Sequence, residues 1–202
     1  MDDLVNKPPT IRSHPFKVWV RATFLSPHLR RLPKDKQILD LACGWGFSFR
    51  INPNIVGLDY DDACVAQLIK EGRNARKGNI LQPLPFPEGT FDIVFTHDVL
   101  EHFSPDDSER IFRNVLPILK PGGLFLNIIP NKLGYDFGLE IGAGHVFYVT
   151  PEYVEEVAKR TGFEYRGYYH SPFPKFFDKF YKHNKRVITC VRPLSPSAAS
   201  PL

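Results

Sequence analysis

Short apolar runs alternate with helix-like patterns along most of this chain, between Gln37 and Arg192. This alternation is typical of βαβ units, in which a helix crosses over between two parallel strands. Seven of the runs are predicted to be strands, at residues 37–42, 55–59, 76–80, 91–96, 123–129, 164–170 and 186–191. We therefore predict an α/β protein with a single Rossmann-like, doubly wound, mostly parallel seven-stranded sheet and helices on both faces.

Three stretches between these runs are predicted to be helices, at residues 61–71, 105–119 and 151–161. Ser104 and Thr150 stand where a side chain caps the first turn of a helix, and Pro105 suits the first helical position. Turn residues follow each helix where it should end: Gly72, Pro121-Gly122-Gly123 and Gly162.

A length of 202 residues, with 43% apolar and 24% charged residues, suits one core and is short for two domains. We expect a helical or lid segment at residues 1–36, a folded domain at residues 37–192 and a disordered tail at residues 193–202. Apolar residues at loosely helical spacing in the first segment fit a helix packed on the sheet edge, a lid or a partner face: Val18, Phe24, Leu25 and Leu29.

Neither export nor membrane insertion is indicated by the sequence. No charged-then-apolar signal pattern follows Met1, and no run approaches the roughly 18 apolar residues that cross a bilayer. Cys43, Cys64 and Cys190 are widely spaced, so neither a disulfide framework nor a thiolate zinc site is indicated. The net charge of +4 permits an acidic partner without the field of a polycation. We expect a soluble protein in the reducing cytoplasm.

The turn after the first predicted strand reads Asp40-Leu41-Ala42-Cys43-Gly44-Trp45-Gly46. Glycines there let the backbone approach a ligand, because a Cβ would forbid positive φ or fill the ligand's space. The second predicted strand ends at Asp59, where a carboxylate can accept both hydroxyls of a ribose. A nicotinamide dinucleotide is disfavoured, because its G-x-G-x-x-G fingerprint needs a third small residue where this chain has Phe49. A ligand made of adenosine and an amino acid fits better.

Four stretches in order, at residues 38–46, 56–59, 84–92 and 116–123, carry a family resemblance. They read Ile-Leu-Asp-Leu-Ala-Cys-Gly-Trp-Gly, Val-Gly-Leu-Asp, Leu-Pro-Phe-Pro-Glu-Gly-Thr-Phe-Asp and Leu-Pro-Ile-Leu-Lys-Pro-Gly-Gly. Together they resemble the class I S-adenosylmethionine-dependent methyltransferases, type 11 subgroup. The resemblance implies that residues 37–192 form a methyltransferase domain that uses S-adenosylmethionine and releases S-adenosylhomocysteine.

The same resemblance implies a set of cofactor contacts. The implied residues are Asp40 in the turn, Gly44, Gly46 and the backbone of Ala42 at the methionine part, Asp59 at the ribose, Tyr60 on one adenine face, Asn79 and Ile80 at the adenine edge, and His97 beside the sulfonium. Structural alternatives stay open for three of them: Asp59 as a helix cap, Tyr60 as a surface aromatic and Asn79 as a turn residue.

Titratable side chains follow the fourth predicted strand, in the run Thr96-His97-Asp98-Val99-Leu100-Glu101-His102. Methyl transfer requires the nucleophile and the methyl group in line within about 3 to 3.5 Å, and a hydroxyl-type nucleophile also requires a base. The candidate catalytic residues are His97, Glu101, His102 and His145. If the run is helical, Asp98, Glu101 and His102 share one face.

Three interpretations of this group stay open. Asp98, Glu101 and His102, with His145, resemble the divalent-metal pattern of small-RNA 2′-O-methyltransferases and ubiquinone-pathway O-methyltransferases, with Asp98 replacing the usual Glu. Alternatively, Asp-x-x-Glu before a helix is a capping box that uses both carboxylates structurally. A histidine base without a metal is the third interpretation.

Two later segments bear on the acceptor. Residues 132–144 are predicted to form a glycine-rich loop over the acceptor pocket, with Tyr135, Asp136 and Glu140 as candidate contacts or as parts of a solvated loop. Residues 173–185 place aromatic side chains at helical spacing with lysines between them, which predicts an amphipathic helix. That helix would pack in the core between the last two strands, or would face RNA or a membrane surface.

We therefore predict a methyltransferase that acts on oxygen or nitrogen of a small molecule. RNA is the alternative acceptor and would need a continuous basic surface joining the pocket to five residues: Arg30, Arg31, Lys175, Lys179 and Lys182. A cofactor-binding module without catalysis is the other alternative, against which the three histidines His97, His102 and His145 argue.

Overall fold

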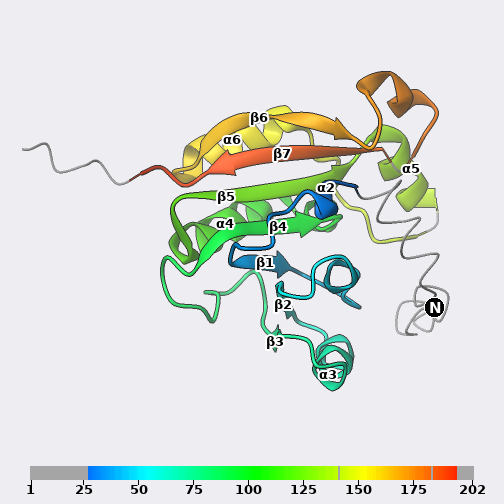
Figure 1. Cartoon of the computed structure of the whole chain (residues 1–202). Coiled ribbons are helices and arrows are strands. Elements are labelled where there is room, and N and C mark those ends of the chain that lie inside the picture. Colours follow the sequence, from blue (N-terminus) through cyan, green and yellow to red (C-terminus); the bar gives the residue numbers. More distant parts are fainter. Residues whose placement is uncertain (1–26, 141, 183, 195–202) are drawn as a thin grey trace, which may run out of the picture.

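The computed structural model describes residues 27–140, 142–182 and 184–194 (Figure 1). A seven-stranded sheet crosses this part of the chain in the order β3-β2-β1-β4-β5-β7-β6. The strands are β1 (Ile38–Leu41), β2 (Val56–Asp59), β3 (Ala75–Lys77), β4 (Phe91–His97), β5 (Leu119–Pro130), β6 (Glu164–Ser171) and β7 (Lys185–Val191). The first five strands are parallel, and β7 lies antiparallel between β5 and β6. The predicted fold class is confirmed.

Helices cover both faces of this sheet. They are α2 (Pro27–Arg30), α3 (Asp62–Lys70), α4 (Pro105–Val115), α5 (Lys132–Glu140) and α6 (Pro151–Thr161), with the short 3₁₀ turns η3 (Ser48–Arg50), η4 (Leu100–His102), η5 (Leu116–Ile118) and η6 (Lys175–Lys179). Neighbouring residues of β4 divide between the two layers: Val94 joins the core under α4 and α6, and Phe95 joins the core under α2 and α3. Figure 1 shows α4 and α6 on the face opposite α2.

The predicted cap residues begin two helices and end one of them. The Ser104 hydroxyl accepts a hydrogen bond from the Asp107 amide at 3.2 Å, and the Thr150 hydroxyl accepts one from the Tyr153 amide at 3.2 Å. Gly162 ends α6 with a φ of 87°, which suits a residue without a Cβ.

Three predicted boundaries were wrong. The helix predicted over residues 105–119 ends at Val115 and gives way to η5, because the Pro117 ring cannot continue an α-helix. The strand β5 then begins at Leu119, so the predicted Pro121-Gly122-Gly123 turn lies inside it, where its pairing with β4 shifts register. The third strand ends at Lys77 instead of residue 80, since the chain turns at Asn79.

The glycine-rich segment predicted as a loop is instead the helix α5. Its glycines serve close packing, because a Cβ at Gly134 would lie 2.4 Å from the Lys182 carbonyl oxygen and one at Gly138 would lie 2.0 Å from the His145 ring. Because both positions lack a side chain, α5 packs closely against the end of the sheet. This packing outweighs the low helix propensity of glycine.

The helix predicted over residues 173–185 is also absent from the core. Among the described residues of this range, the only helical turn is η6; none of its residues is buried, and its rings face outward.

Of the predicted segment 1–36, the described part begins at Pro27 and forms α2, whose Leu29 packs into the sheet. Val18, Phe24, Leu25 and the tail beyond Leu194 lie outside the described residues. Within the described ranges, no helix combines the length and apolar character needed to cross a membrane.

Candidate active site

The turn after β1 holds three residues in left-handed backbone conformation. The φ angles are 64° at Ala42, 50° at Gly44 and 70° at Gly46. A Cβ at Gly46 would lie 2.3 Å from the Leu68 side chain, so glycine lets the turn pack against α3. A Cβ at Gly44 would meet nothing within 4 Å, so the backbone there borders open space that a ligand can fill.

Asp59 connects the end of β2 to this turn. Its buried carboxylate accepts hydrogen bonds from the Gly44 amide at 2.7 Å and from the Asp61 amide at 3.0 Å. Asp61, and not Asp59, caps α3 by accepting a bond from the Cys64 amide at 3.0 Å. The helix-cap alternative for Asp59 is therefore wrong.

Asp40 lies buried beneath the same turn. Burial raises the pKa of its carboxyl group to about 7; the hydrogen bond from the Ser48 hydroxyl opposes that rise and the nearby Asp59 charge adds to it. The folded protein therefore disfavours the ionised form of the Asp40 carboxyl group.

The three residues expected around an adenine differ in exposure and in hydrogen bonding. Tyr60 is 74% exposed directly after β2, so its ring is accessible for stacking. The Asn79 side-chain oxygen accepts a bond from the Leu81 amide at 2.9 Å, which confirms its turn role. Ile80 is buried, and its carbonyl accepts a bond from the Asn114 amide group at 3.0 Å.

His97, the last residue of β4, packs against a histidine that the sequence did not single out. The ring of His28 on α2 lies edge-on to it, with 5.2 Å between centroids. The Nδ1 atom of His28 lies 3.3 Å from the Ser171 hydroxyl, while its buried Nε2 atom has no hydrogen-bond partner. Burial, together with neighbouring His97, lowers the pKa of His28 well below its usual value. The contacts join residues far apart in sequence, so no local pattern marks them.

Asp98 does not share a helical face with Glu101 and His102. It has a φ of 55°, and its carboxylate binds the Lys185 ammonium at 2.7 Å and 2.8 Å. Burial would raise the pKa of Asp98, but the Lys185 and His97 charges outweigh it and lower that pKa. The capping-box interpretation is wrong as well, since η4 has no side-chain cap.

Glu101, His102 and His145 do come together. One ligand-capable atom from each lies within 4.8 Å of the others. Glu101 is fully buried, and neither carboxylate oxygen has a hydrogen-bond partner, although the His145 Nε2 atom is 3.9 Å away. Burial, with the Asp98 charge, raises the pKa of Glu101.

The two histidines of this cluster are oriented by backbone carbonyls. His102 Nδ1 lies 3.1 Å from the Gly144 oxygen, and His145 Nδ1 lies 2.9 Å from the Tyr135 oxygen. Because a carbonyl only accepts, each Nδ1 carries the proton and each Nε2 of a neutral ring keeps a lone pair. The Tyr135 ring also stacks on His145, with 5.2 Å between centroids. Tyr135 is thus a buried residue that packs against His145 and helps to orient its ring.

A cavity of about 170 Å³ opens beside this cluster, between α5 and the carboxyl ends of β4 and β5. Its walls are Asp98, Glu101, Pro130, Gly134, Phe137, Gly138, Ala143, His145, Lys182 and Lys185. Lys185 was missed by sequence reasoning because it lies 87 residues from Asp98. The direction of β7 would have revealed it, since the first residue of an antiparallel strand lies at the carboxyl edge of its parallel neighbours.

Residues 39–127 match the family model described as a methyltransferase domain. A probable S-adenosylmethionine-dependent methyltransferase from Mycolicibacterium smegmatis is 28% identical over 137 residues, covering 64% of this chain and 52% of that protein. The ubiquinone/menaquinone biosynthesis C-methyltransferase of Cronobacter sakazakii is 28% identical over 164 residues, covering 72% of this chain and 62% of that protein. The chain thus spans only part of the length of these curated relatives.

Solved structures share the fold at lower identity. The putative methyltransferase of Haloferax volcanii, in a complex with the Trm112 methyltransferase activator, superposes with a TM-score of 0.68 at 15% identity, covering 87% of this chain and 92% of that chain. The strand order, the glycine turn and the family match agree with one another. Residues 39–127 therefore form a methyltransferase domain of the class I S-adenosylmethionine-dependent type.

Proposed function

We propose that this chain transfers a methyl group from S-adenosylmethionine to oxygen or nitrogen of a small-molecule acceptor held in the cavity under α5. The cavity carries the proposal, because it lies at the carboxyl ends of β4 and β5, one strand away from the β1 turn. Ligands of doubly wound sheets bind along this edge. A volume of about 170 Å³ suits a small molecule or the reacting end of a larger one.

The β1 turn fits the family's cofactor. Gly44 borders open space, Asp59 presents a carboxylate beside it, and the exposed Tyr60 ring can cover an adenine. When bound, S-adenosylmethionine supplies an electrophilic methyl group on a sulfonium. The chain itself holds the two partners in line and excludes water from between them.

A hydroxyl acceptor also needs a proton acceptor, which His102 and His145 can provide. Burial, with the neighbouring His145, lowers the pKa of His102, so its ring is neutral near pH 7. The Nδ1 atom of each ring donates to a carbonyl, which leaves Nε2 as the basic atom.

As an alternative use of the same cluster, we propose a divalent cation, which would take the Nε2 lone pairs of the two histidines in place of their role as bases. Glu101 has two buried oxygens without hydrogen bonds, and both histidines have the carbonyl contacts that orient metal-binding imidazoles. Asp98 is excluded from this ligand set by its bond to Lys185.

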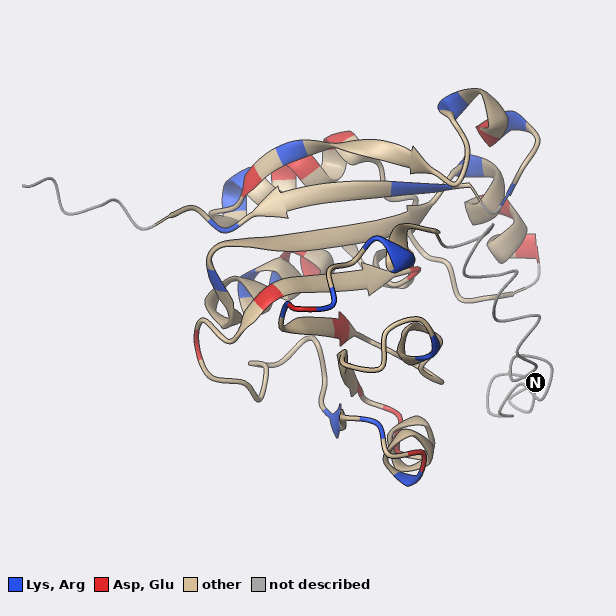
Figure 2. Cartoon of the chain, viewed as in Figure 1, with Lys and Arg blue, Asp and Glu red and all other residues tan. Residues whose placement is uncertain are grey.

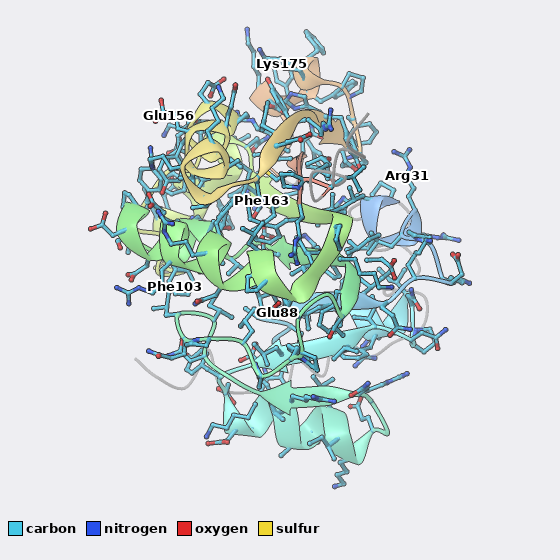
Figure 3. The ribbon with its side chains drawn as sticks, turned by 90° about the vertical axis from the view of Figure 1, so that its left-hand side faces the viewer. Arg31, Glu88, Phe103, Glu156, Phe163 and Lys175 are labelled. Carbon is cyan, nitrogen blue, oxygen red and sulfur yellow. The ribbon has the colours of Figure 1, made fainter. Side chains whose placement is uncertain are left out.

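Within the described residues, the arrangement of charged side chains does not favour RNA as the acceptor. Arg31, directly after α2, and Lys175 on η6 lie well apart (Figure 3), and Lys and Arg are interspersed with Asp and Glu over the helices (Figure 2). This arrangement favours the small-molecule acceptor.

Transfer of a labelled methyl group to a panel of phenols, amines, carboxylates and RNA tests the proposal. We expect incorporation into at least one small molecule, with a loss of about a hundredfold or more in the variant His102→Ala or His145→Ala, because a general base is usually worth ~10²–10⁴-fold. Incorporation into RNA alone would replace the proposed acceptor class, and no incorporation at all would favour a binding module.

A further inference from the structure

An exposed aromatic surface lies at η6, beside α5. We call it the η6 surface and define it as Phe173, Lys175, Phe176, Phe177, Lys179 and Phe180. The exposed fraction reaches 69% for Phe176 and 70% for Phe180. Contiguous apolar patches of this kind on a protein surface mark interaction sites.

The rings form one cluster. Centroid distances are 5.0 Å between Phe173 and Phe177, 5.6 Å between Phe176 and Phe177, and 5.6 Å between Phe176 and Phe180. No residue of η6 is buried, so these rings contribute little to the core.

Buried polar side chains hold this segment in place. Asn131, at the end of β5, donates to the carbonyls of Asp178 and Tyr181 at 3.3 Å and 3.0 Å, and Asn184 accepts from the Phe173 amide at 3.0 Å. Both asparagines are 0% exposed. The fold therefore fixes the segment with its rings outward.

The outward charge of the η6 surface is positive. Lys175 and Lys179 are exposed, and neither forms an ion pair with another described residue. The acidic residue of η6, Asp178, points inward, where it accepts a bond from Asn184 at 2.6 Å and contacts His170. Figures 2 and 3 show basic residues, Lys175 among them, on this outermost turn.

The η6 surface is followed in sequence by a residue of the acceptor cavity, since Lys182 stands two residues beyond Phe180. The Lys182 ammonium lies 3.3 Å from the centroid of the Phe137 ring on α5, and both residues line the cavity. The outer side of α5 adds exposed Leu133 and Leu139. An occupant of this surface would therefore sit beside the cavity wall.

We infer that the η6 surface docks the protein on an anionic lipid bilayer. Phenylalanine rings beside lysines match the acyl boundary and the negative headgroups of such a surface. Single-stranded RNA fits less well, because the rings pack against one another and the cations are lysines, which do not stack as arginine does. Delivery of a membrane-dissolved acceptor to the cavity rests on the proposed function, whereas docking does not.

Sedimentation with vesicles tests the inference without any methyl transfer. The full chain is mixed with phosphatidylcholine vesicles or with vesicles containing phosphatidylglycerol, at low and high salt. We expect binding to the anionic vesicles, weakened by salt and reduced about tenfold or more in F176S/F180S and in K175Q/K179Q. The matched control I69S/K70Q changes an exposed apolar residue and a lysine on α3, far from η6, and should bind like the wild type.

Melting curves and an RNA mobility shift complete the test. All variants change exposed side chains and should melt like the wild type. Wild-type protein that stays off anionic vesicles overturns the inference, as does equal binding by F176S/F180S. If the same variants instead abolish an RNA shift or a dimer seen in sedimentation, the surface serves that partner and the membrane assignment is wrong.

Discussion

The Lys185 ammonium lies 2.7 Å and 2.8 Å from the two carboxylate oxygens of Asp98, joining the start of β7 to the residue after β4. The two side chains are 12% and 36% exposed. Because β7 is antiparallel to β5, its first residue reaches the edge where the parallel strands end. The pair forms part of the cavity wall, and the Asp98 carboxylate is engaged by Lys185 beside the group of Glu101, His102 and His145.

Lys185→Met should destabilise the protein by about 2 kcal/mol. Breaking a buried ion pair costs ~3–5 kcal/mol of stability, and an exposed pair is worth ~0–1 kcal/mol. The expected loss lies between these values because Asp98 is partly solvated. Urea unfolding measures the loss. Lys77→Met, which breaks the exposed pair of Lys77 with Asp62, is the control and should cost well under 1 kcal/mol, as an exposed pair of roughly median worth does. Equal losses in the two variants would contradict the role given to Lys185.

Asp40 should give the protein a pH-dependent stability. Its pKa is raised to about 7, so between about pH 4, the ordinary carboxyl pKa, and that value the folded state binds more protons than the unfolded state. Stability due to this group therefore falls as pH rises through that window and levels off above it. Unfolding by urea at several pH values should show this fall in the wild type and a smaller one in Asp40→Asn. Identical slopes would mean that Asp40 titrates normally in the folded protein.

Divalent cations should stabilise the protein through Glu101. A ligand at ~100 times its dissociation constant stabilises a fold by ~2.7 kcal/mol, so Mn²⁺ or Zn²⁺ should raise the melting temperature. Glu101→Gln should abolish that rise, while exposed Glu88→Gln should retain it. Chelator should also reduce methyl transfer in the wild type. If no ion changes the melting temperature and chelator does not change the activity, the metal proposal is wrong and the histidines act as bases without a metal.

Local patterns predicted much of the fold. The caps at Ser104 and Thr150 and the stop at Gly162 depend on neighbours in sequence, so α4 and α6 begin as expected and α6 ends as expected. The glycine turn after β1 and the carboxylate ending β2 are likewise local, and both lie at the predicted edge of the sheet.

Tertiary contacts decided the rest. Gly134 and Gly138 would usually weaken a helix, but their missing side chains let α5 pack against Lys182 and His145. The rings of residues 173–181 have helical spacing, yet the buried Asn131 and Asn184 hold that segment as a short outward turn. The partners of Asp98 and His97 come from β7 and α2, which no local pattern could reveal.

Calorimetric titration with S-adenosylhomocysteine tests the central claim, that the β1 turn and Asp59 hold the nucleoside of the cofactor. We expect saturable binding to the wild type, weakened at least about tenfold, or about 1.4 kcal/mol, in Asp59→Ala. Asp62→Ala, three residues further on at the exposed start of α3, should bind like the wild type. Unchanged affinity in a folded Asp59→Ala variant, or no binding by the wild type, would contradict the account.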